Sequence, residues 1–405
     1  MEPQTGRAAR LGQVEDAPVV VYVQQLLEEA VARQASDVHF EPYEEAYRVR
    51  MRIDGQLREV SSAPLAFRDR LAARIKVMAR LDVAEKRLPQ DGRIKLKLPD
   101  DRDLDLRVST LPTLFGEKVV VRVLDARQAQ LDLASLGYEP QDLALLEQAI
   151  RRPHGMVLVT GPTGSGKTQS LYACLNQLNT AEVNIATVED PCEIQMQGIN
   201  QVNVQDKPGL NFAVALRAFL RQDPDILMVG EIRDLETAQI AIQAAQTGHL
   251  VLSTLHTNDA PATLVRLRNM GVAPYNIAAS VSLITAQRLV RRLCEHCREP
   301  ISLSADALRQ AGWPTQALHA DPCPVYAARG CHQCHKGFKG RTGIFQVMPV
   351  SAAMQTLILD EAGTQEMERQ AFEEGVRSLR EAGLRKVLSG ETSLEEVLAA
   401  TREQA

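Results

Sequence analysis

The 405-residue sequence lacks any run of about 18 or more apolar residues, so it predicts no membrane-spanning helix. Its first stretch, MEPQTGRAARLGQVED, also lacks the apolar segment of a secretory signal. We therefore expect a cytoplasmic chain, in which cysteines stay reduced. The seven cysteines then need an explanation other than disulfide bonds.

Aromatic residues and excess positive charge are also scarce. Aromatics make up 4% of the chain, and 46 basic against 51 acidic residues give a net charge of −5. Neither stacking surfaces for single strands nor a general attraction to nucleic acid or anionic membranes is expected. Association with a membrane should therefore depend on a protein partner. An apolar fraction of 45% and a charged fraction of 24% are typical of a folded protein, and the length predicts two domains, with three possible.

The first part of the chain predicts an α+β domain built on an antiparallel sheet. Residues 1–16 are polar, and we expect a flexible N-terminus there. Over 17–125, a helical pattern is followed by short alternating segments, including a hairpin that turns at Asp54-Gly55. Residues 126–136 are predicted to be a linker.

Strands alternate with helices in the next part, residues 137–290. Apolar segments at MVLVTG, IATVED, DILMVG and HLVLSTL predict strands, and helical patterns separate them. This alternation predicts an α/β domain with a parallel sheet and helices on both faces. Beyond it, we expect a cysteine-rich subdomain at 291–345 and a helical C-terminal region at 346–405.

The stretch GPTGSGKT fits the phosphate-loop pattern G-x-x-x-x-G-K-[ST] at every fixed position. It follows a predicted strand and opens a predicted helix, which is the context that the motif requires. Lys167 is expected to neutralise nucleotide phosphates, and the Thr168 hydroxyl to bind Mg²⁺. The glycines let backbone N–H groups face the phosphates. The nucleotide-binding loop is Gly161, Pro162, Thr163, Gly164, Ser165 and Gly166, and ATP is the expected cofactor.

The stretch DPDILMVGEIRD raises a question about catalysis. A hydrolysis strand should end in an Asp for Mg²⁺ and a Glu for water, but Gly230 stands where that Asp would be. Glu231 remains placed to orient or deprotonate the attacking water. Glu189 and Asp190 end another predicted strand and could supply the absent charge, because the ends of parallel strands converge. Their alternative role is to form a turn before a proline.

One histidine is a further candidate. His249 and His256 bracket the strand of HLVLSTLH, seven positions apart, so they should lie on opposite faces. His256 follows the C-terminal end, where phosphates bind, and could donate to the γ-phosphate. The alternative is a structural histidine.

Four of the cysteines form two C-x-x-C pairs, CEHC and CHQC. In a reduced compartment, two such pairs predict a tetrahedral zinc site at Cys294, Cys297, Cys331 and Cys334. Four thiolates leave no open position, so a structural role is expected. A redox pair is the alternative, although one pair would suffice for that. Neighbouring side chains that could replace a ligand are His296, His332, His335 and Cys323.

The phosphate loop, ATVEDP, DPDILMVGEIRD and TGHLVLSTLHTNDA occur in a fixed order. They resemble the four nucleotide boxes of the secretion ATPase superfamily, the motors of type II secretion and type IV pili. ASDVHFEP, RMRIDG, RLPQDGR and RVSTLPTLFGEKVVVRVL are similar to the domain that precedes the motor in that family. The resemblance covers nearly the whole chain and implies a RecA-like P-loop NTPase domain. In this family, glycine in place of the Asp is usual.

The resemblance also implies roles for individual residues. It places the nucleotide phosphates at Lys167 and Thr168, an acidic box at Glu189 and Asp190, the catalyst at Glu231, and His256 near the γ-phosphate. It further implies arginines that reach in from the preceding domain. Arg93 and Arg107 lie on the matching motifs QDGR and LRVST. Without the resemblance, both would be interpreted as solvated strand arginines.

Pilus-assembly and secretion motors of this family commonly carry such cysteine pairs, which retraction motors lack. Within the family, the resemblance to the pilus-assembly ATPases rests on the stretch AAQTGHLVLSTLHTNDAPATLVRLRNMGVAPYNIAASVSLITAQRLVRRLC. The resemblance implies a homo-hexameric ATPase that powers assembly of a type IV pilus or related fibre. It would work at the inner membrane, through a platform protein. A type II secretion ATPase is the alternative, and a nucleic-acid-binding zinc protein with a nucleotide switch is a third, disfavoured hypothesis. Two features differ from what the resemblance implies: this sequence starts without the further N-terminal docking domain that such motors often have, and Gln346 stands where Glu is usual.

Overall fold

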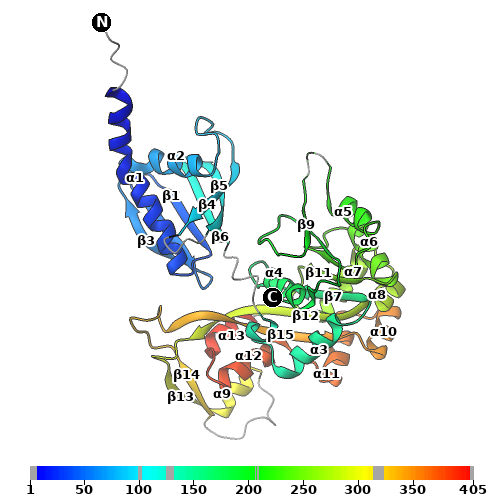
Figure 1. The fold of residues 1–405 in the computed structure, drawn as a ribbon. Coiled ribbons are helices and arrows are strands. Elements are labelled where there is room, and N and C mark those ends of the chain that lie inside the picture. The colour runs from blue at the N-terminus through cyan, green and yellow to red at the C-terminus, as the bar shows by residue number, and fades with distance from the viewer. Residues whose placement is uncertain are drawn as a thin grey trace. The chain divides into compact units, whose positions relative to one another are not determined.

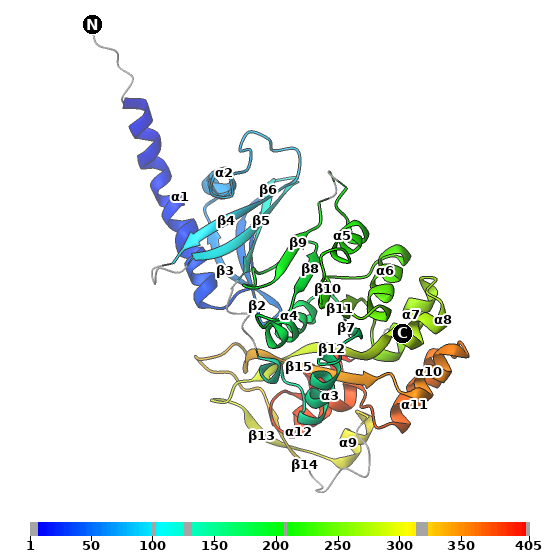
Figure 2. The same ribbon diagram turned by 45° about the vertical axis from the view of Figure 1, so that its right-hand side comes forward.

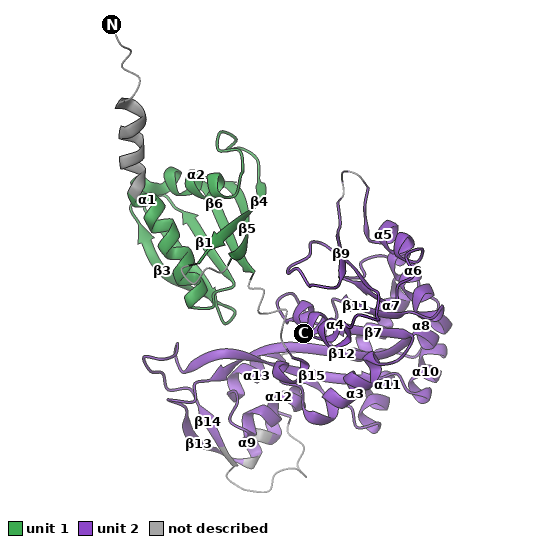
Figure 3. Ribbon diagram, in the orientation of Figure 1, with its two compact units in different colours: residues 1–126 green, residues 127–405 purple. Residues whose placement is uncertain are grey.

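The computed structural model describes residues 7–98, 103–124, 132–205, 207, 209–312 and 323–401. Figures 1 and 2 show that the chain is built around β-sheets, and Figure 3 marks two compact units, Met1–Ala126 and Arg127–Ala405. Each unit has hydrophobic clusters of its own. The division falls at the start of the predicted linker, whose residues 126–131 lie outside the described ranges.

Unit 1 is a six-stranded antiparallel sheet in the order β3-β2-β1-β6-β5-β4. On β2, Tyr47, Val49 and Met51 are fully buried and share one core with the two helices. The elements are α1 (Arg7–Ala32), β1 (Asp37–Pro42), β2 (Tyr47–Ile53), β3 (Gln56–Ala63), α2 (Arg68–Met78), β4 (Gln90–Lys97), β5 (Asp103–Thr113) and β6 (Gly116–Leu124), with a short 3-10 turn at Leu65–Phe67.

Two local features of unit 1 bear on the sequence analysis. Asp54 and Gly55 both have positive φ, 51° and 83°, as a two-residue hairpin turn with right-handed strand twist requires. The predicted hairpin is therefore present between β2 and β3. Helix α1 begins at Arg7, inside the stretch expected to be flexible.

Unit 2 is built on a seven-stranded sheet in the order β15-β12-β7-β11-β10-β8-β9. Its elements are α3 (Pro140–Ile150), β7 (Gly155–Thr160), α4 (Lys167–Leu178), β8 (Ile185–Glu189), β9 (Asn200–Asn203), α5 (Phe212–Phe219), β10 (Ile226–Val229), α6 (Leu235–Gln246), β11 (Leu250–Leu255), α7 (Ala260–Asn269), α8 (Pro274–Ser280), β12 (Val281–Leu293), β13 (Glu299–Leu303), α9 (Ala305–Gln310), β14 (Cys323–Ala327), β15 (Phe338–Pro349), α10 (Ala352–Leu359), α11 (Thr364–Glu373), α12 (Leu379–Leu388) and α13 (Leu394–Ala400), after a 3-10 helix at Leu133–Leu136.

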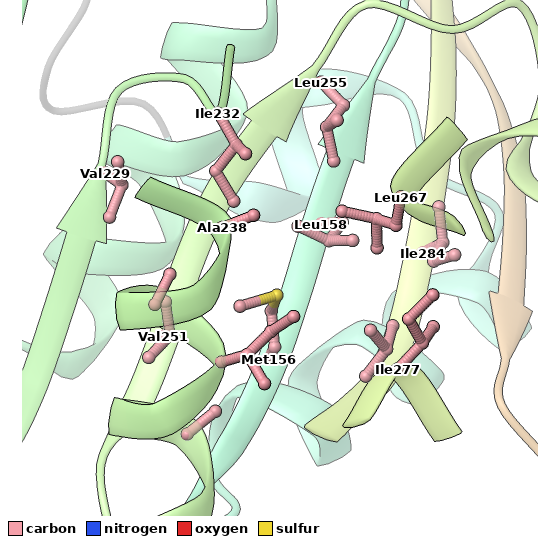
Figure 4. Packing of buried hydrophobic residues seen from close by; sticks show 14 of the residues in the cluster. Met156, Leu158, Val229, Ile232, Ala238, Val251, Leu255, Leu267, Ile277 and Ile284 are labelled. Atoms are coloured by element: carbon pink, nitrogen blue, oxygen red, sulfur yellow. The ribbon is translucent and has the colours of Figure 1, made fainter. Parts of the chain in front are cut away.

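Helices cover both faces of this sheet, as predicted. On β7, Met156 and Leu158 belong to one buried cluster, whereas Val157 and Val159 belong to another. Successive side chains of a strand point to opposite faces, so the two clusters lie on the two sides of the sheet. Figure 4 shows the first cluster, in which β7, β10, β11 and β12 pack against residues of α6, α7 and α8.

The sheet is mixed rather than wholly parallel, which corrects the sequence prediction. Strands β12, β7, β11, β10, β8 and β9 are parallel neighbours, but β15 pairs antiparallel with β12. The chain leaves β12, forms the β13–β14 hairpin and returns beside it, which reverses its direction (Figures 1 and 2). On β15, the buried Gln346 accepts a hydrogen bond of 2.8 Å from Ala260 N at the start of α7. An amide oxygen can therefore accept this bond without burying a charge.

No helix in the described ranges is both long enough and apolar enough to cross a membrane.

Candidate nucleotide and metal sites

The phosphate loop connects the buried strand β7 to helix α4, which begins at Lys167 as predicted. Gly161, Gly164 and Gly166 all have positive φ, at 147°, 80° and 90°. A Cβ at Gly161 would lie 2.5 Å from the carbonyl oxygen of Gln287, so only glycine fits at this position. The loop can thus turn its backbone N–H groups inward at the N-terminus of a helix, the arrangement that binds phosphate.

The side chain of Lys167 folds back over this loop. Its Nζ donates to the carbonyl oxygens of Gly161 and Pro162, at 2.8 Å and 3.2 Å. Burial lowers the pKa of Lys167, the charge of Glu231 opposes that shift, and the charge of Arg288 adds to it. The ammonium group therefore lies among neutral oxygens and near a second cation. A bound anion would stabilise its charge.

Two hydroxyl groups of this region fit a bound polar ligand. The oxygens of Thr160 and Ser165 are buried and have no hydrogen-bond partner among the described residues. Buried polar atoms are usually satisfied, so unpaired hydroxyls beside a phosphate loop are consistent with a site that binds a ligand or water.

Strands β8, β10 and β11 bring three predicted residues together at their C-terminal ends. His256 Nε2 lies 3.4 Å from Glu231 Oε2, and Arg233 pairs with the other carboxylate oxygen of Glu231. The same arginine lies 3.6 Å from Asp190. Burial raises the pKa of Glu231, but the hydrogen bond and charge of Arg233, with a contribution from His256, outweigh it and hold that pKa below its ordinary value. A carboxylate that stays ionised can orient or activate water.

Glu189 has surroundings different from those of Asp190. It is 3% exposed and accepts hydrogen bonds from Tyr172 on α4 at 2.5 Å, from Thr187 at 2.7 Å and from Gln201 at 3.2 Å. Asp190 is exposed. Glu189 therefore ties the end of β8 to the helix that follows the phosphate loop, while the next carboxylate faces outward.

Gly230 lies close to the end of β8. A Cβ there would lie 3.3 Å from Val188 O, which is tighter than most such contacts, and 3.4 Å from Glu189 Cα, an ordinary contact. Its backbone is also fixed, because its N–H donates to Val188 O at 2.8 Å and its carbonyl accepts from Thr254 at 2.7 Å. A side chain at this position would require the neighbouring Val188 carbonyl to shift by a few tenths of an ångström.

Arg93 and Arg107 lie in unit 1, on β4 and β5. They are direct partners in the antiparallel register, so their side chains share one face of the sheet. Arg93 is exposed and Arg107 is half-buried. The predicted contact of these arginines with nucleotide stays a prediction.

Sequence reasoning missed three residues of this site. Arg233 joins Glu231 to Asp190, Gln287 donates to Ser165 O at 2.7 Å, and Arg288 is one of the charges that act on Lys167. Each lies in a stretch that carried the family resemblance, GEIRD or TAQRLVRR, but no spacing rule distinguishes it there.

The four cysteines of the two C-x-x-C pairs form one cluster. The sulfur atoms of Cys294, Cys297, Cys331 and Cys334 lie within 4.8 Å of one another. Three of the pairs are 3.6 Å, 3.6 Å and 4.0 Å apart. Zinc–sulfur bonds of about 2.3 Å in a tetrahedron would separate the sulfurs by about 3.8 Å. Within the described residues this cluster includes no histidine, and the side chain of Cys323 lies outside them.

Comparison with known proteins decides the family of the chain. A family model described as type II/IV secretion system protein matches residues 12–399. The chain belongs to this family. It is 54% identical over 389 residues to the type IV pilus assembly ATPase PilB of Acinetobacter baylyi, covering 96% of this chain and 67% of that protein. It is 52% identical over 391 residues to PilB of Pseudomonas aeruginosa, with coverages of 96% and 69%.

A second group of relatives is nearly as similar. The type II secretion system ATPase E of Vibrio cholerae is 50% identical over 390 residues, which cover 96% of this chain and 76% of that protein. These relatives are ATPases by name, and this family member is likewise an ATPase, as the sequence predicted. Family membership also implies ATP as its nucleotide.

Solved structures confirm the predicted fold class. The pilus retraction motor PilT with bound ADP matches with a TM-score of 0.64 and 22% identity, covering 94% of this chain and 97% of that one. The ATPase DotB of Legionella pneumophila matches with a TM-score of 0.68 and 20% identity, covering 94% and 95%. The antiparallel sheet of unit 1, the mixed sheet of unit 2 with its cysteine cluster, and the helical C-terminal region agree with the predicted fold class.

Proposed function

We propose that this ATPase powers assembly of a type IV pilus or a closely related fibre at the inner membrane. The observation that carries this proposal is the similarity to three PilB proteins, at 54%, 52% and 52% identity over nearly the whole chain. The proposed enzyme is cytoplasmic and reaches the membrane through a platform protein of the machine.

The proposed nucleotide site uses the loop of residues 161–166 for the phosphates. Lys167 exchanges its bonds to the loop carbonyls for bonds to phosphate oxygens. Thr168 and Asp190 would hold Mg²⁺, the latter through water, and the ion would neutralise phosphate charge. Glu189 would act indirectly, by fixing the end of β8 against α4 through Tyr172.

In the proposed reaction, Glu231 orients the attacking water and accepts its proton. This residue lies at the end of β10, and its carboxylate is kept ionised by Arg233. His256, beside it, donates to the γ-phosphate in the transition state. Both roles place charge where the reaction needs it, at positions fixed by neighbouring parallel strands.

Arg93 and Arg107 are proposed as the arginines that stabilise the developing phosphate charge. Such residues act as arginine fingers in other NTPases. Their role here rests on the family resemblance of QDGR and LRVST and on their shared face of the unit 1 sheet. If they bind the nucleotide held by unit 2, hydrolysis would be coupled to movement of one unit against the other. A homo-hexameric ring is the proposed assembly.

The cysteine cluster is proposed to hold one structural Zn²⁺. Cys294 follows β12 directly, and Cys334 precedes β15. A bound ion would fasten the turns at the ends of these two strands, and four thiolates would leave it no open position for catalysis.

A type II secretion ATPase is the second candidate, favoured by 49–50% identity to three secretion proteins. The test replaces the chromosomal gene in its own organism by a Glu231→Gln copy, so that partners stay matched. Loss of surface pili, with secreted enzymes unchanged, supports the pilus motor. Loss of secretion with normal pili overturns it in favour of the second candidate.

A further inference from the structure

Strand β12 passes beside the phosphate loop. Ala286 pairs with Thr160, the last residue of β7, so the next residues of β12 run beside the loop. The side chain of Gln287 is 2% exposed and bridges the loop and α4: its Nε2 donates to Ser165 O at 2.7 Å, and its Oε1 accepts from Ser170 at 2.8 Å. The position of β12 relative to the loop is therefore fixed by buried hydrogen bonds.

Arg288 follows Gln287 and is held by neutral oxygens alone. Its guanidinium donates to Gln287 O at 3.2 Å, to Asn258 O at 3.0 Å and to Asn258 Oδ1 at 3.2 Å. Among the described residues, no carboxylate lies within ion-pair distance of it. By contrast, Arg291 on the same strand pairs with Glu396 at 2.6 Å. Buried charges are normally paired, and the partly buried Arg288 has only neutral hydrogen-bond partners among the described residues.

Lys167 and Arg288 bond to backbone oxygens of adjacent segments: Lys167 Nζ donates to Gly161 O, Arg288 donates to Gln287 O, and a Cβ at Gly161 would lie 2.5 Å from that Gln287 oxygen. Burial lowers the pKa of both Lys167 and Arg288, and the charge of Arg288 lowers that of Lys167 further. The charge of Asp259 raises the pKa of Arg288, and the charge of Glu231 raises that of Lys167. The Glu231 carboxylate, however, already pairs with Arg233 and contacts His256. Two like charges in a partly desolvated place are costly unless an anion binds between them.

We propose that Arg288 is a second phosphate-binding cation of the nucleotide site, which contacts a phosphate oxygen alongside Lys167. Arginine suits this role because its planar guanidinium can hold phosphate while keeping a bond to Asn258. This inference deepens the nucleotide site proposed above and rests on it. The competing role is purely structural, in which Arg288 only supports the loop that carries Asn258.

The test separates charge from hydrogen bonding. Arg288→Gln keeps amide donors for the Asn258 carbonyl but removes the charge, whereas Arg288→Lys keeps the charge. The matched control is Arg292→Gln on the same strand, whose side chain is exposed and lies 3.6 Å from Glu391. Binding of ATP and of ADP to the full chain is measured by titration calorimetry, with Lys167→Ala as the reference for a damaged site. Thermal unfolding of each variant checks that it folds.

Loss of a hydrogen bond to a charged group predicts that Arg288→Gln binds both nucleotides about 10- to 100-fold more weakly. Arg288→Lys should recover most of that loss, and Arg292→Gln should bind as the parent does. Suppose that a folded Arg288→Gln protein binds both nucleotides within about twofold of the parent, while Lys167→Ala binds them more weakly. The proposed role of Arg288 is then overturned, but the nucleotide site is not. If Lys167→Ala also binds normally, the proposed nucleotide site itself is wrong.

Discussion

The guanidinium of Arg233 pairs with the carboxylate of Glu231, two positions earlier, and lies 3.6 Å from Asp190. One side chain therefore connects the acids at the ends of β8 and β10. His256, at the end of β11, contacts the same Glu231 carboxylate at 3.4 Å. The orientation of Glu231 thus depends on side chains from neighbouring strands, and the predictions below concern the groups around it.

Lys167→Ala should abolish tight binding of ATP. The ammonium group is the side-chain cation that the phosphate loop itself provides, and alanine leaves the loop carbonyls that it now bonds without that donor. Titration calorimetry with ATP and Mg²⁺ measures the loss. Lys339→Ala is a suitable control, because Lys339 is exposed on β15. Parent-like affinity in Lys167→Ala would mean that the nucleotide binds elsewhere.

One zinc ion per chain should copurify with the protein and be lost from the Cys294→Ser/Cys297→Ser double variant. Removing two of four thiolates leaves the tetrahedron incomplete, and residues 291–340 should unfold locally because metal binding is coupled to folding there. Elemental analysis and hydrogen exchange measure both effects. Cys192→Ser, outside the cluster, should retain the metal. Parent protein with well under one equivalent of zinc would refute the assignment.

The Arg93→Ala/Arg107→Ala double variant should lose about 10³-fold in turnover, the size of effect seen for other arginine fingers. Affinity for ATP should fall much less, since the phosphate loop is unchanged. Steady-state hydrolysis and calorimetry separate the two effects. Light scattering follows the proposed hexamer, which ATP analogues should favour. Lys95→Ala, exposed on the same strand β4, is the control. Turnover at the parent rate would exclude a catalytic role for this arginine pair.

The ion pair between Arg291 and Glu396 should make the stability of unit 2 depend on pH. Burial raises the pKa of Glu396, but its bonds from Arg291 outweigh that and lower it below the ordinary value. A lowered pKa stabilises the folded state above the unfolded value of about 4.3, and this contribution is lost as the pH falls toward the folded value. Glu396→Gln should therefore cost about 1–3 kcal/mol at pH 7.

Thermal unfolding at pH 7 and below pH 4 measures this effect. The difference in Tm between parent and Glu396→Gln should shrink at the lower pH, where the parent carboxylate also becomes protonated. Glu395→Gln, one position away and exposed, should unfold as the parent does at both values. An equal Tm difference at both pH values would show that the ion pair is not its cause.

Local sequence was sufficient for the phosphate loop and the central parallel strands. A glycine-rich motif between a buried strand and a helix depends on neighbours in sequence, so α4 begins at Lys167 as predicted. Strands β12 and β15 were not predicted. Their pairing joins Leu283 to Pro349 and Leu293 to Phe338, residues far apart in sequence, and charged residues interrupt their apolar pattern. Only the tertiary pairing adds β12 to the parallel strands and makes β15 the edge strand of the sheet.

The nucleotide site also has features that only the tertiary structure reveals. Glu189 and Asp190 are adjacent and were assigned one shared role, but successive residues of a strand point to opposite sides. Glu189 is accordingly buried against Tyr172, and Asp190 is exposed beside Arg233. Which acid an arginine meets depends on the sheet order, which composition and spacing do not reveal.

The most direct test of the account is ATP turnover in Glu231→Gln. The amide keeps the size of the side chain but accepts no proton, so turnover should fall by at least about 100-fold, as expected for a lost general base. ATP affinity should stay within a few-fold of the parent, because Lys167 and the loop are untouched. Glu182→Gln, at an exposed position, should behave as the parent does. Substantial turnover in Glu231→Gln would contradict the assignment of the catalytic residue.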